Sequence, residues 1–212
     1  MKSNFESHIK VVGAGLALAM VIGACASLAP KTDYVAPPLG STWVQSWHDT
    51  GSYGSGDSTH QIKRGERIWQ GQKVNTFEQS RGTLVAQMDG TWLAIVRGDT
   101  PMMSWNPGVN FDYPLEVGKK WTKNASVTIH RSKKIIPFSY TGKVEAYEDV
   151  SVPAGTFKAF KVLHTDTLGN DQVLWFSPQL GIFVKQHMVR TSRHPAGPGT
   201  RDVEVTSQDI LK

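Results

Sequence analysis

Cysteine and long apolar runs are both scarce in this chain of 212 residues. A single cysteine, Cys25, excludes an intramolecular disulfide, so the fold must be held together by its hydrophobic core. The most apolar stretch, Val11 to Ala24, has 14 residues, whereas a helix needs about 20 apolar residues to cross a bilayer. Its length and its place near the N-terminus are typical of the central region of a cleaved export signal.

The residues before the cysteine indicate where that signal ends. Ile22-Gly23-Ala24-Cys25 places an aliphatic residue and two small residues directly before the thiol, and Lys2 and Lys10 flank the apolar run. This pattern resembles the lipobox of bacterial lipoproteins. The resemblance implies cleavage between Ala24 and Cys25, lipidation of Cys25 with fatty acyl chains, and a location in the bacterial cell envelope. The alternative is an incidental cysteine near an ordinary cleavage site.

The same resemblance implies which membrane the protein joins. Ala26 is not the aspartate associated with inner-membrane retention, so we expect an outer-membrane lipoprotein that faces the periplasm. Two or three acyl chains anchor a protein stably, where one binds only marginally. Without residues 1–24 the formal net charge falls from +5 to +4, and no basic cluster is dense enough to predict nucleic-acid binding.

These observations divide the chain into three parts. Residues 1–24 are predicted to be a signal peptide. Residues 25–40 are predicted to be the lipidated cysteine and an extended tether, because Pro30, Pro37 and Pro38 stand among few apolar side chains. Residues 41–212 are enough for one domain of ordinary size.

Helical periodicity is absent from that domain. Gly, Pro, Asn or Asp interrupts the chain every 8 to 12 residues, with β-branched and aromatic residues between the interruptions. The pattern predicts an all-β antiparallel fold, either a sandwich or a curved half-barrel. The expected strands are Thr42–His48, His60–Trp69, Lys73–Gln79, Thr83–Gln87, Thr91–Val96, Trp121–His130, Phe138–Ala146, Phe157–Thr165, Gln172–Phe176, Ile182–Val189 and Asp202–Thr206.

The domain contains two stretches that resemble each other. The entry to Trp43, which begins at Pro38, resembles the segment from Pro114 to Trp121, and Trp92 corresponds to Trp175 further along. Internal similarity of this kind predicts a duplication with halves at about 38–100 and 114–190. The alternative is a chance alignment of β-rich sequence.

Motifs for catalysis and cofactor binding are missing, so we predict no enzyme, catalytic residue, cofactor or metal site. Two weaker possibilities remain open in the first half. His48 and His60 could approach each other if their strands pair, and Asp49 or Asp57 could complete a metal or catalytic site. The glycine-rich segment between the histidines, Gly51 to Asp57, is predicted to be a flexible hairpin loop.

Two surface features could contact an envelope ligand. Arg131, Lys133 and Lys134 form a basic run, with Lys119, Lys120 and Lys123 one strand earlier, and could attract anionic headgroups. Trp105 lies in a Met- and Trp-rich segment that we predict to be a loop over an apolar groove, or in contact with lipid or glycan. The alternatives are a solvated hairpin tip for the basic run and simple packing for Trp105.

The second half carries three ordered motifs that begin at Pro114, Glu148 and Trp175. They run Pro114-Leu115-Glu116-Val117-Gly118-Lys119-Lys120-Trp121, Glu148-Asp149-Val150-Ser151-Val152-Pro153-Ala154-Gly155-Thr156-Phe157 and Trp175-Phe176-Ser177-Pro178-Gln179-Leu180-Gly181, the last followed by Val184-Lys185. They resemble a family of uncharacterised bacterial periplasmic proteins and lipoproteins that share a β-rich domain of unknown function. The resemblance implies a fold and supplies no catalytic residue.

Three functional hypotheses follow. The first is a non-enzymatic envelope lipoprotein whose β domain binds a partner protein, a lipid or a glycan. The second is a periplasmic lipid or lipoprotein carrier with a continuous apolar concave face. The third is an enzyme whose site is assembled from scattered residues, with His48, Asp49 and His60 as candidates.

Overall fold

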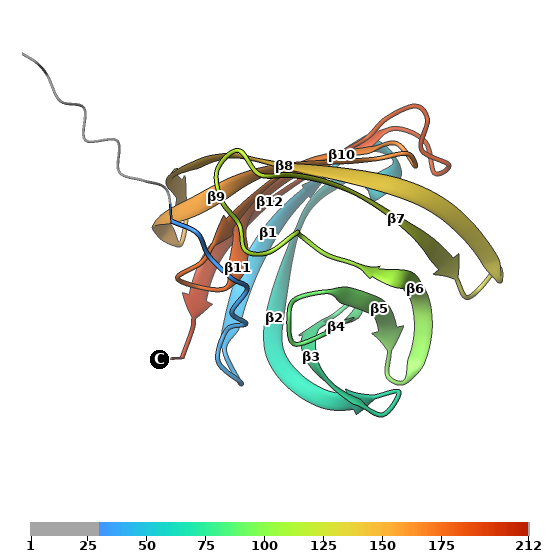
Figure 1. Ribbon diagram of the computed structural model, residues 1–212, viewed down its shortest axis with the longest axis horizontal. Coiled ribbons are helices and arrows are strands. Elements are labelled where there is room, and N and C mark those ends of the chain that lie inside the picture. Colours follow the sequence, from blue (N-terminus) through green and yellow to red (C-terminus); the bar gives the residue numbers. More distant parts are fainter. Residues whose placement is uncertain (1–29, 212) are drawn as a thin grey trace, which may run out of the picture.

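Twelve antiparallel strands close into a barrel in the computed structural model, which describes residues 30–211 (Figure 1). The lipobox and Cys25 lie outside the described residues. The strands are β1 (Thr42–Asp49), β2 (Gly56–Trp69), β3 (Gln72–Gln79), β4 (Gly82–Ala86), β5 (Trp92–Arg97), β6 (Thr100–Val109), β7 (Lys120–Ile129), β8 (Lys134–Val152), β9 (Gly155–Asp166), β10 (Asn170–Ser177), β11 (Ile182–Arg190) and β12 (Gly199–Asp209).

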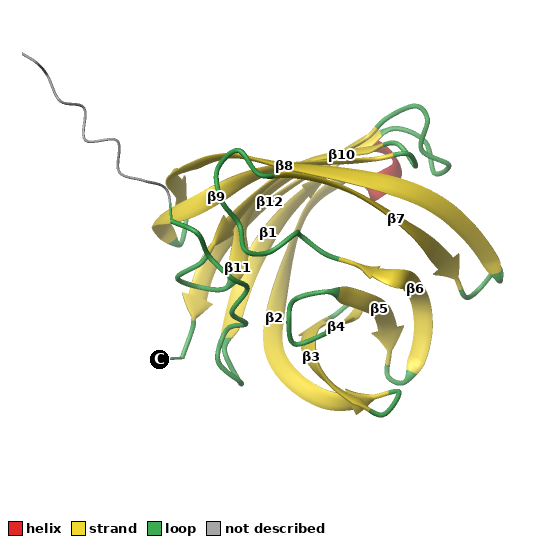
Figure 2. Cartoon of the chain, in the orientation of Figure 1, coloured by secondary structure: helices red, strands yellow, loops and turns green. Residues whose placement is uncertain are grey.

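Each strand pairs with its neighbour in sequence, and β1 closes the barrel by pairing with β12 from Thr42↔Asp209 to Asp49↔Arg201. The predicted all-β antiparallel fold is confirmed. The closed barrel differs from both predicted forms, the sandwich and the half-barrel, because the β1–β12 ladder leaves no open side. Among residues 30–211, no helix is long and apolar enough to cross a membrane, and the one helical turn is the 3₁₀ segment η1 (Gly51–Tyr53) (Figure 2).

Strand β1 illustrates why these residues form a barrel wall. Trp43, Gln45 and Asp49 are buried, and the residues between them are more exposed. This period of two is the pattern of a strand with one face toward a core and the other toward water.

The barrel has more than one core. A large cluster around Phe138, Tyr140 and Phe160 fills the space beneath β7 to β10. Strands β2 to β6 curl tightly below those long strands and enclose a smaller core that contains Val74 and Val85 (Figure 1). The far end of the β8–β9 hairpin packs against β12, where the Ala154 N–H donates to the Val205 carbonyl over 3.1 Å.

All eleven expected strands overlap observed ones, but β6 was not predicted. The sequence predicts a Met- and Trp-rich loop between the two halves at Met102 to Pro107. That expectation is wrong: β6 pairs with β5 and β7, and register shifts in β5 accommodate the irregular segment. The duplication stays a prediction.

The end of the predicted tether lies against the barrel. Thr32 and Leu115 exchange backbone hydrogen bonds of 3.0 and 2.7 Å, and the Tyr34 ring lies 5.4 Å from that of Tyr113 and 6.2 Å from that of Phe176. Burial raises the pKa of Tyr34 to about 12. The segment is extended, as expected, but the Tyr34 side chain packs against the barrel and does not extend into solvent.

Candidate ligand cavity in the barrel

Two adjoining cavities, of about 340 and 490 Å³, occupy the barrel interior. Trp92, Trp105 and Phe111 line both of them, so these three aromatic side chains form the partition between the two spaces. Ligand pockets in proteins are typically about 300–1,000 Å³ and mostly apolar. The interior therefore has the size and the lining of a binding site.

The smaller cavity is lined mainly by apolar side chains from β1, β2 and the strands on either side of that pair. Tyr34 from the tether forms part of its wall, and Gln45, Gln79 and Gln186 are among its few polar residues. The Gln79 side-chain oxygen is buried and has no hydrogen-bond partner in the described chain. The apolar lining includes Trp43, Trp47, Ile62, Phe77, Leu84, Ile95, Ile182 and Val203.

The larger cavity combines an apolar wall with a polar end. Met103, Val127, Phe138 and Leu168 contribute to the wall, while Asp166, Arg190 and His194 line the end together with the β11–β12 loop. His164 lies within this cavity wall, 8% exposed, with its ring 5.3 Å from that of Tyr140. Its Nδ1 atom is buried without a partner among residues 30–211.

An aromatic and cationic stack lies at the end of the barrel opposite the tether. The guanidinium of Arg190 lies 3.9 Å from the Tyr53 ring centroid, and that of Arg201 lies 4.7 Å from the same ring and 4.1 Å from the Trp47 ring. Arg81, from the β3–β4 turn, lies 5.4 Å from the Trp47 ring. We call Arg81, Arg190 and Arg201 the arginine end. Tyr53 belongs to η1, which lies beside the β9–β10 and β11–β12 loops (Figure 2).

Asp49 balances part of this positive charge. Arg201 donates hydrogen bonds of 2.6 and 2.7 Å to the two Asp49 carboxylate oxygens, and Asp49 is 4% exposed. The hydrogen bonds from Arg201 lower the pKa of Asp49, assisted by the charges of Arg201 and Arg81 and opposed by burial. The carboxylate is therefore ionised at neutral pH.

The residues proposed for a metal or catalytic site do not converge. His48 lies on the outer face, where its Nδ1 is 2.7 Å from Asp57 Oδ1, and this hydrogen bond raises the pKa of His48. His60 is buried against Trp47, with ring centroids 4.1 Å apart. Strands β1 and β2 do pair, but His48 lies opposite Asp57 and His60 lies opposite Gln45, and the pleat places the two histidines on opposite faces. Among residues 30–211, no group of three His, Cys, Asp or Glu side chains could hold a metal ion.

The basic residues form two separate groups. Arg131, Lys133 and Lys134 lie exposed at the β7–β8 hairpin tip. Lys119 and Lys123 lie at the other end of β7, where their Nζ atoms are 3.0 and 2.8 Å from the two Asp112 carboxylate oxygens. The grouping expected from sequence is therefore wrong, because a strand of this length separates its two ends by about 30 Å. Contact between the hairpin tip and an envelope ligand stays a prediction.

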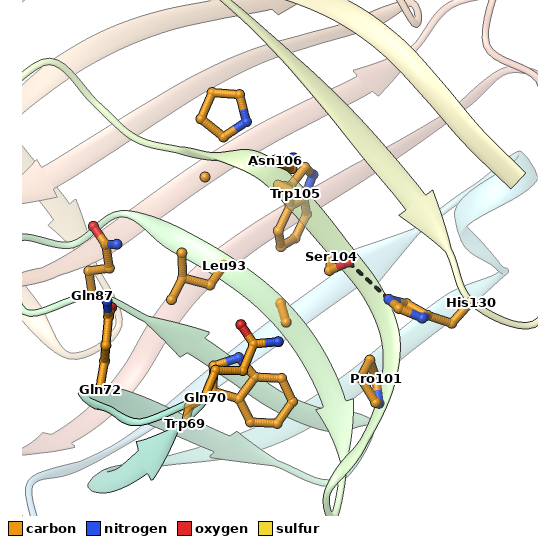
Figure 3. Close-up of a pocket in the computed structure, with 13 residues that line it drawn as sticks. Trp69, Gln70, Gln72, Gln87, Leu93, Pro101, Ser104, Trp105, Asn106 and His130 are labelled. Atoms are coloured by element: carbon orange, nitrogen blue, oxygen red, sulfur yellow. Dashed lines mark hydrogen bonds between the residues drawn. The ribbon is translucent and has the colours of Figure 1, made fainter. Parts of the chain in front are cut away.

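Trp105 also borders a third pocket, a groove of about 490 Å³ at the mouth of the β2–β6 curl (Figure 3). Trp69, Gln70, Gln72, Gln87 and Asn106 contribute aromatic and amide groups to it. Among the lining residues drawn, the hydrogen bond marked is that between Ser104 Oγ and His130 Nε2, 2.9 Å long. The four amide side chains are thus not hydrogen-bonded to one another.

The interior histidine makes folding stability depend on pH. Burial lowers the pKa of His164 below its ordinary value of 6.5. In mildly acidic solution the unfolded chain then binds more protons than the folded one. The contribution of His164 to the free energy of unfolding is therefore fully present above about pH 6.5 and is lost as the pH falls. We expect urea denaturation at pH 7.5, 6.5 and 5.5 to give a pH dependence that is visibly flatter in His164→Phe. An equal slope in both proteins would contradict this assignment.

Three solved structures resemble this chain in fold. They are a candidate exported protein of Bacteroides fragilis with a YmcC-like fold (12% identity, TM-score 0.49, 84% of this chain and 99% of that chain), a candidate lipoprotein of Parabacteroides distasonis (11%, 0.46, 85% and 100%) and the hypothetical lipoprotein YmcC of Escherichia coli (11%, 0.45, 81% and 86%). No family model and no curated protein matches the chain. The resemblance of its second half to a family of uncharacterised domains stays a prediction.

Proposed function

We propose that this chain is a lipid-anchored envelope protein whose barrel holds an apolar ligand in its interior, without catalysing a reaction on it. The observation that carries the proposal is the pair of adjoining cavities divided by Trp92, Trp105 and Phe111. This proposal joins the first two hypotheses from sequence, the binding protein and the lipid carrier. The lipobox ending at Cys25 supports the anchor and an outer-membrane location.

Apolar lining determines the class of ligand. Burial of hydrocarbon contributes about 0.8 kcal/mol per methylene group. The hydrocarbon chain of a ligand in these cavities therefore gains affinity with each added carbon. Trp92, Trp105 and Phe111 line both cavities. Rotation of these side chains would let one elongated ligand extend through both spaces.

Two neighbouring methionines on β6 allow a matched test. Met103 lines the larger cavity, whereas Met102 is 40% exposed. We expect native mass spectrometry of the protein purified from the envelope to find the added mass of a bound lipid. Organic extraction should remove this added mass. Met103→Trp should fill the cavity and reduce the occupancy at least several-fold, and Met102→Trp should not. An empty barrel in the unmodified protein, or equal occupancy in both variants, would count against the proposal.

The anchor is tested separately from the cavity. We expect metabolic labelling with radioactive palmitate to mark the full chain, and Cys25→Ala to abolish the label and to release the protein from the outer-membrane fraction. Labelling that persists in Cys25→Ala would overturn the proposed lipidation site without affecting the cavity proposal.

The groove in Figure 3 supports a second candidate function, the binding of a neutral saccharide. Its lining combines aromatic faces, which can stack on sugar rings, with amides that donate and accept hydrogen bonds, and Trp69 and Gln72 are two such groups (Figure 3). Isothermal titration with uncharged oligosaccharides of glucose, galactose and N-acetylglucosamine tests it. Binding should be lost in Gln72→Ala and kept in Ile68→Ala, whose side chain is 69% exposed and outside the groove. No heat with any of these sugars would remove this candidate.

A further inference from the structure

The arginine end carries more positive than negative charge. Three guanidinium groups lie around the Trp47 and Tyr53 rings, and Asp49 is the carboxylate in direct contact with them, 2.6 Å from Arg201 and 3.9 Å from Arg81. Asp166 lies near Arg190 but is engaged elsewhere, since both its oxygens accept hydrogen bonds from Asn170. Arg81 and Arg201 are two cations that share one anion, Asp49, and among residues 30–211 the guanidinium of Arg190 has no carboxylate of its own. This end of the barrel is therefore electropositive.

Two histidines register this positive field. Burial, followed by the charges of Arg81 and Arg201, lowers the pKa of His60. Burial, followed by the charge of Arg190, lowers the pKa of His194. Both rings are therefore neutral at neutral pH, and the positive charge of this end comes from the arginines.

Some hydrogen-bonding capacity at this end is unused. Arg190 donates through Nη1 to the Ser52 carbonyl over 2.9 Å, but its Nε is buried and has no partner in the described part of the chain. Arg201 directs Nε and Nη2 to Asp49, and Arg81 is half exposed. An unpaired buried donor is destabilising, and an anionic acceptor would satisfy it.

The arginines also adjoin the apolar cavities. Arg201 lines the smaller cavity and Arg190 the larger one, so the same end of the barrel touches both spaces. The stacking on Tyr53 and Trp47 fixes the guanidinium planes before any ligand arrives. An arginine fork held in place suits the oxygens of a phosphate or carboxylate.

We propose that the arginine end binds the anionic head of an amphiphile, a phosphate or a carboxylate, whose hydrocarbon chain occupies the cavities. This inference rests on the proposed function, because it names the class of ligand for the same interior site. The anionic head of the ligand lies at the end of the barrel opposite the tether, and the ligand's hydrocarbon chain points toward Tyr34.

Three ligands with the same hydrocarbon chain length separate the contribution of the head group to binding from that of the tail. The full-length protein in phosphatidylcholine nanodiscs is titrated calorimetrically with decyl phosphate, decanoate and decanol, and empty nanodiscs provide the blank. We expect at least one of the two anions to bind about 10-fold or more tightly than decanol, the effect of one to two charge-assisted hydrogen bonds. Inorganic phosphate in excess should compete with decyl phosphate for the head site.

Variants assign the preference to the arginines. Arg190→Gln should abolish most of the preference for the anion, while Arg193→Gln, an exposed arginine in the adjacent loop, removes the same charge and should leave it intact. Arg81 lies in an exposed turn, so Arg81→Gln is a second test of the preference that leaves Arg190 and Arg201 in place. Circular dichroism confirms that each variant is folded.

The outcomes distinguish this inference from the proposed function. If the three ligands bind with equal affinity, the cavity binds hydrocarbon but the arginine end does not recognise the head, and only this inference is overturned. The same holds if the preference for the anions persists in both Arg190→Gln and Arg81→Gln. If none of the ligands binds, both proposals are overturned.

Discussion

Replacing Asp49 with alanine is expected to lower the free energy of unfolding by about 3 kcal/mol, the cost of leaving a buried partner charge uncompensated. Arg201 would lose both of its charge-assisted hydrogen bonds, and it would then face Arg81 without the intervening carboxylate. For a domain of this size the loss corresponds to a fall of roughly 6–12 °C in Tm.

The same hairpin offers a matched control for Asp49. Asp57 also forms an ion pair with a partner on the neighbouring strand, His48, but its side chain is 85% exposed. Exposed pairs contribute about 0–1 kcal/mol, so Asp57→Ala should leave the urea midpoint nearly unchanged. Equal losses in the two variants would mean that the Asp49–Arg201 pair behaves like a surface ion pair.

Replacing Gly142 with valine is expected to destabilise the barrel by about 3 kcal/mol, because it forces a buried aromatic ring out of its place. Gly142 lies opposite Trp121 in the β7–β8 ladder, and a Cβ atom on Gly142 would overlap the Trp121 ring. Trp121 is 7% exposed, so its displacement exposes a large apolar surface to water.

A double-mutant cycle tests whether this clash is the cause. In a Trp121→Leu background, Gly142→Val should cost less than half of its effect in the unmodified protein, measured by urea denaturation. Thr141→Val, one residue earlier, serves as the control, because Thr141 is exposed and its hydroxyl meets Thr165 at 2.8 Å on the outer surface. Additive costs in the cycle would show that Trp121 is not the group that valine displaces.

Local patterns in the sequence were sufficient for the fold class and for most strands. The Gly, Pro, Asn and Asp residues that interrupt the chain every 8 to 12 residues depend only on sequence close by, and Gly155, with a positive φ at the β8–β9 turn, is one of them. Closure of the barrel depends on pairing between β1 and β12, in which Asp49 and Arg201 meet across an interval of 152 residues. No local pattern records such a pairing, so the sandwich and the half-barrel were equally compatible with the sequence.

The arginine end was missed for a related reason. Arg190 and Arg201 each lie one residue outside a predicted strand, since the expected strands ended at Val189 and began at Asp202. A charged side chain that faces a cavity interrupts the apolar alternation that marks a strand, so these two arginines made their own strands look shorter in the sequence. Trp105, which the sequence marks as a possible ligand contact, lies within β6 rather than in the predicted loop, and its contact with a ligand stays a prediction.

The seam between β1 and β12 has a consequence for how the chain reaches its native state. The other eleven pairings all join consecutive strands and can form as each pair of strands is completed. The seam must wait until the two ends of the domain meet, because the entropy of closing so long a loop has to be overcome before the ladder gains any hydrogen bonds. Until then β1 and β12 both present unpaired edges, which is the interval in which copies of the chain could exchange terminal strands or aggregate.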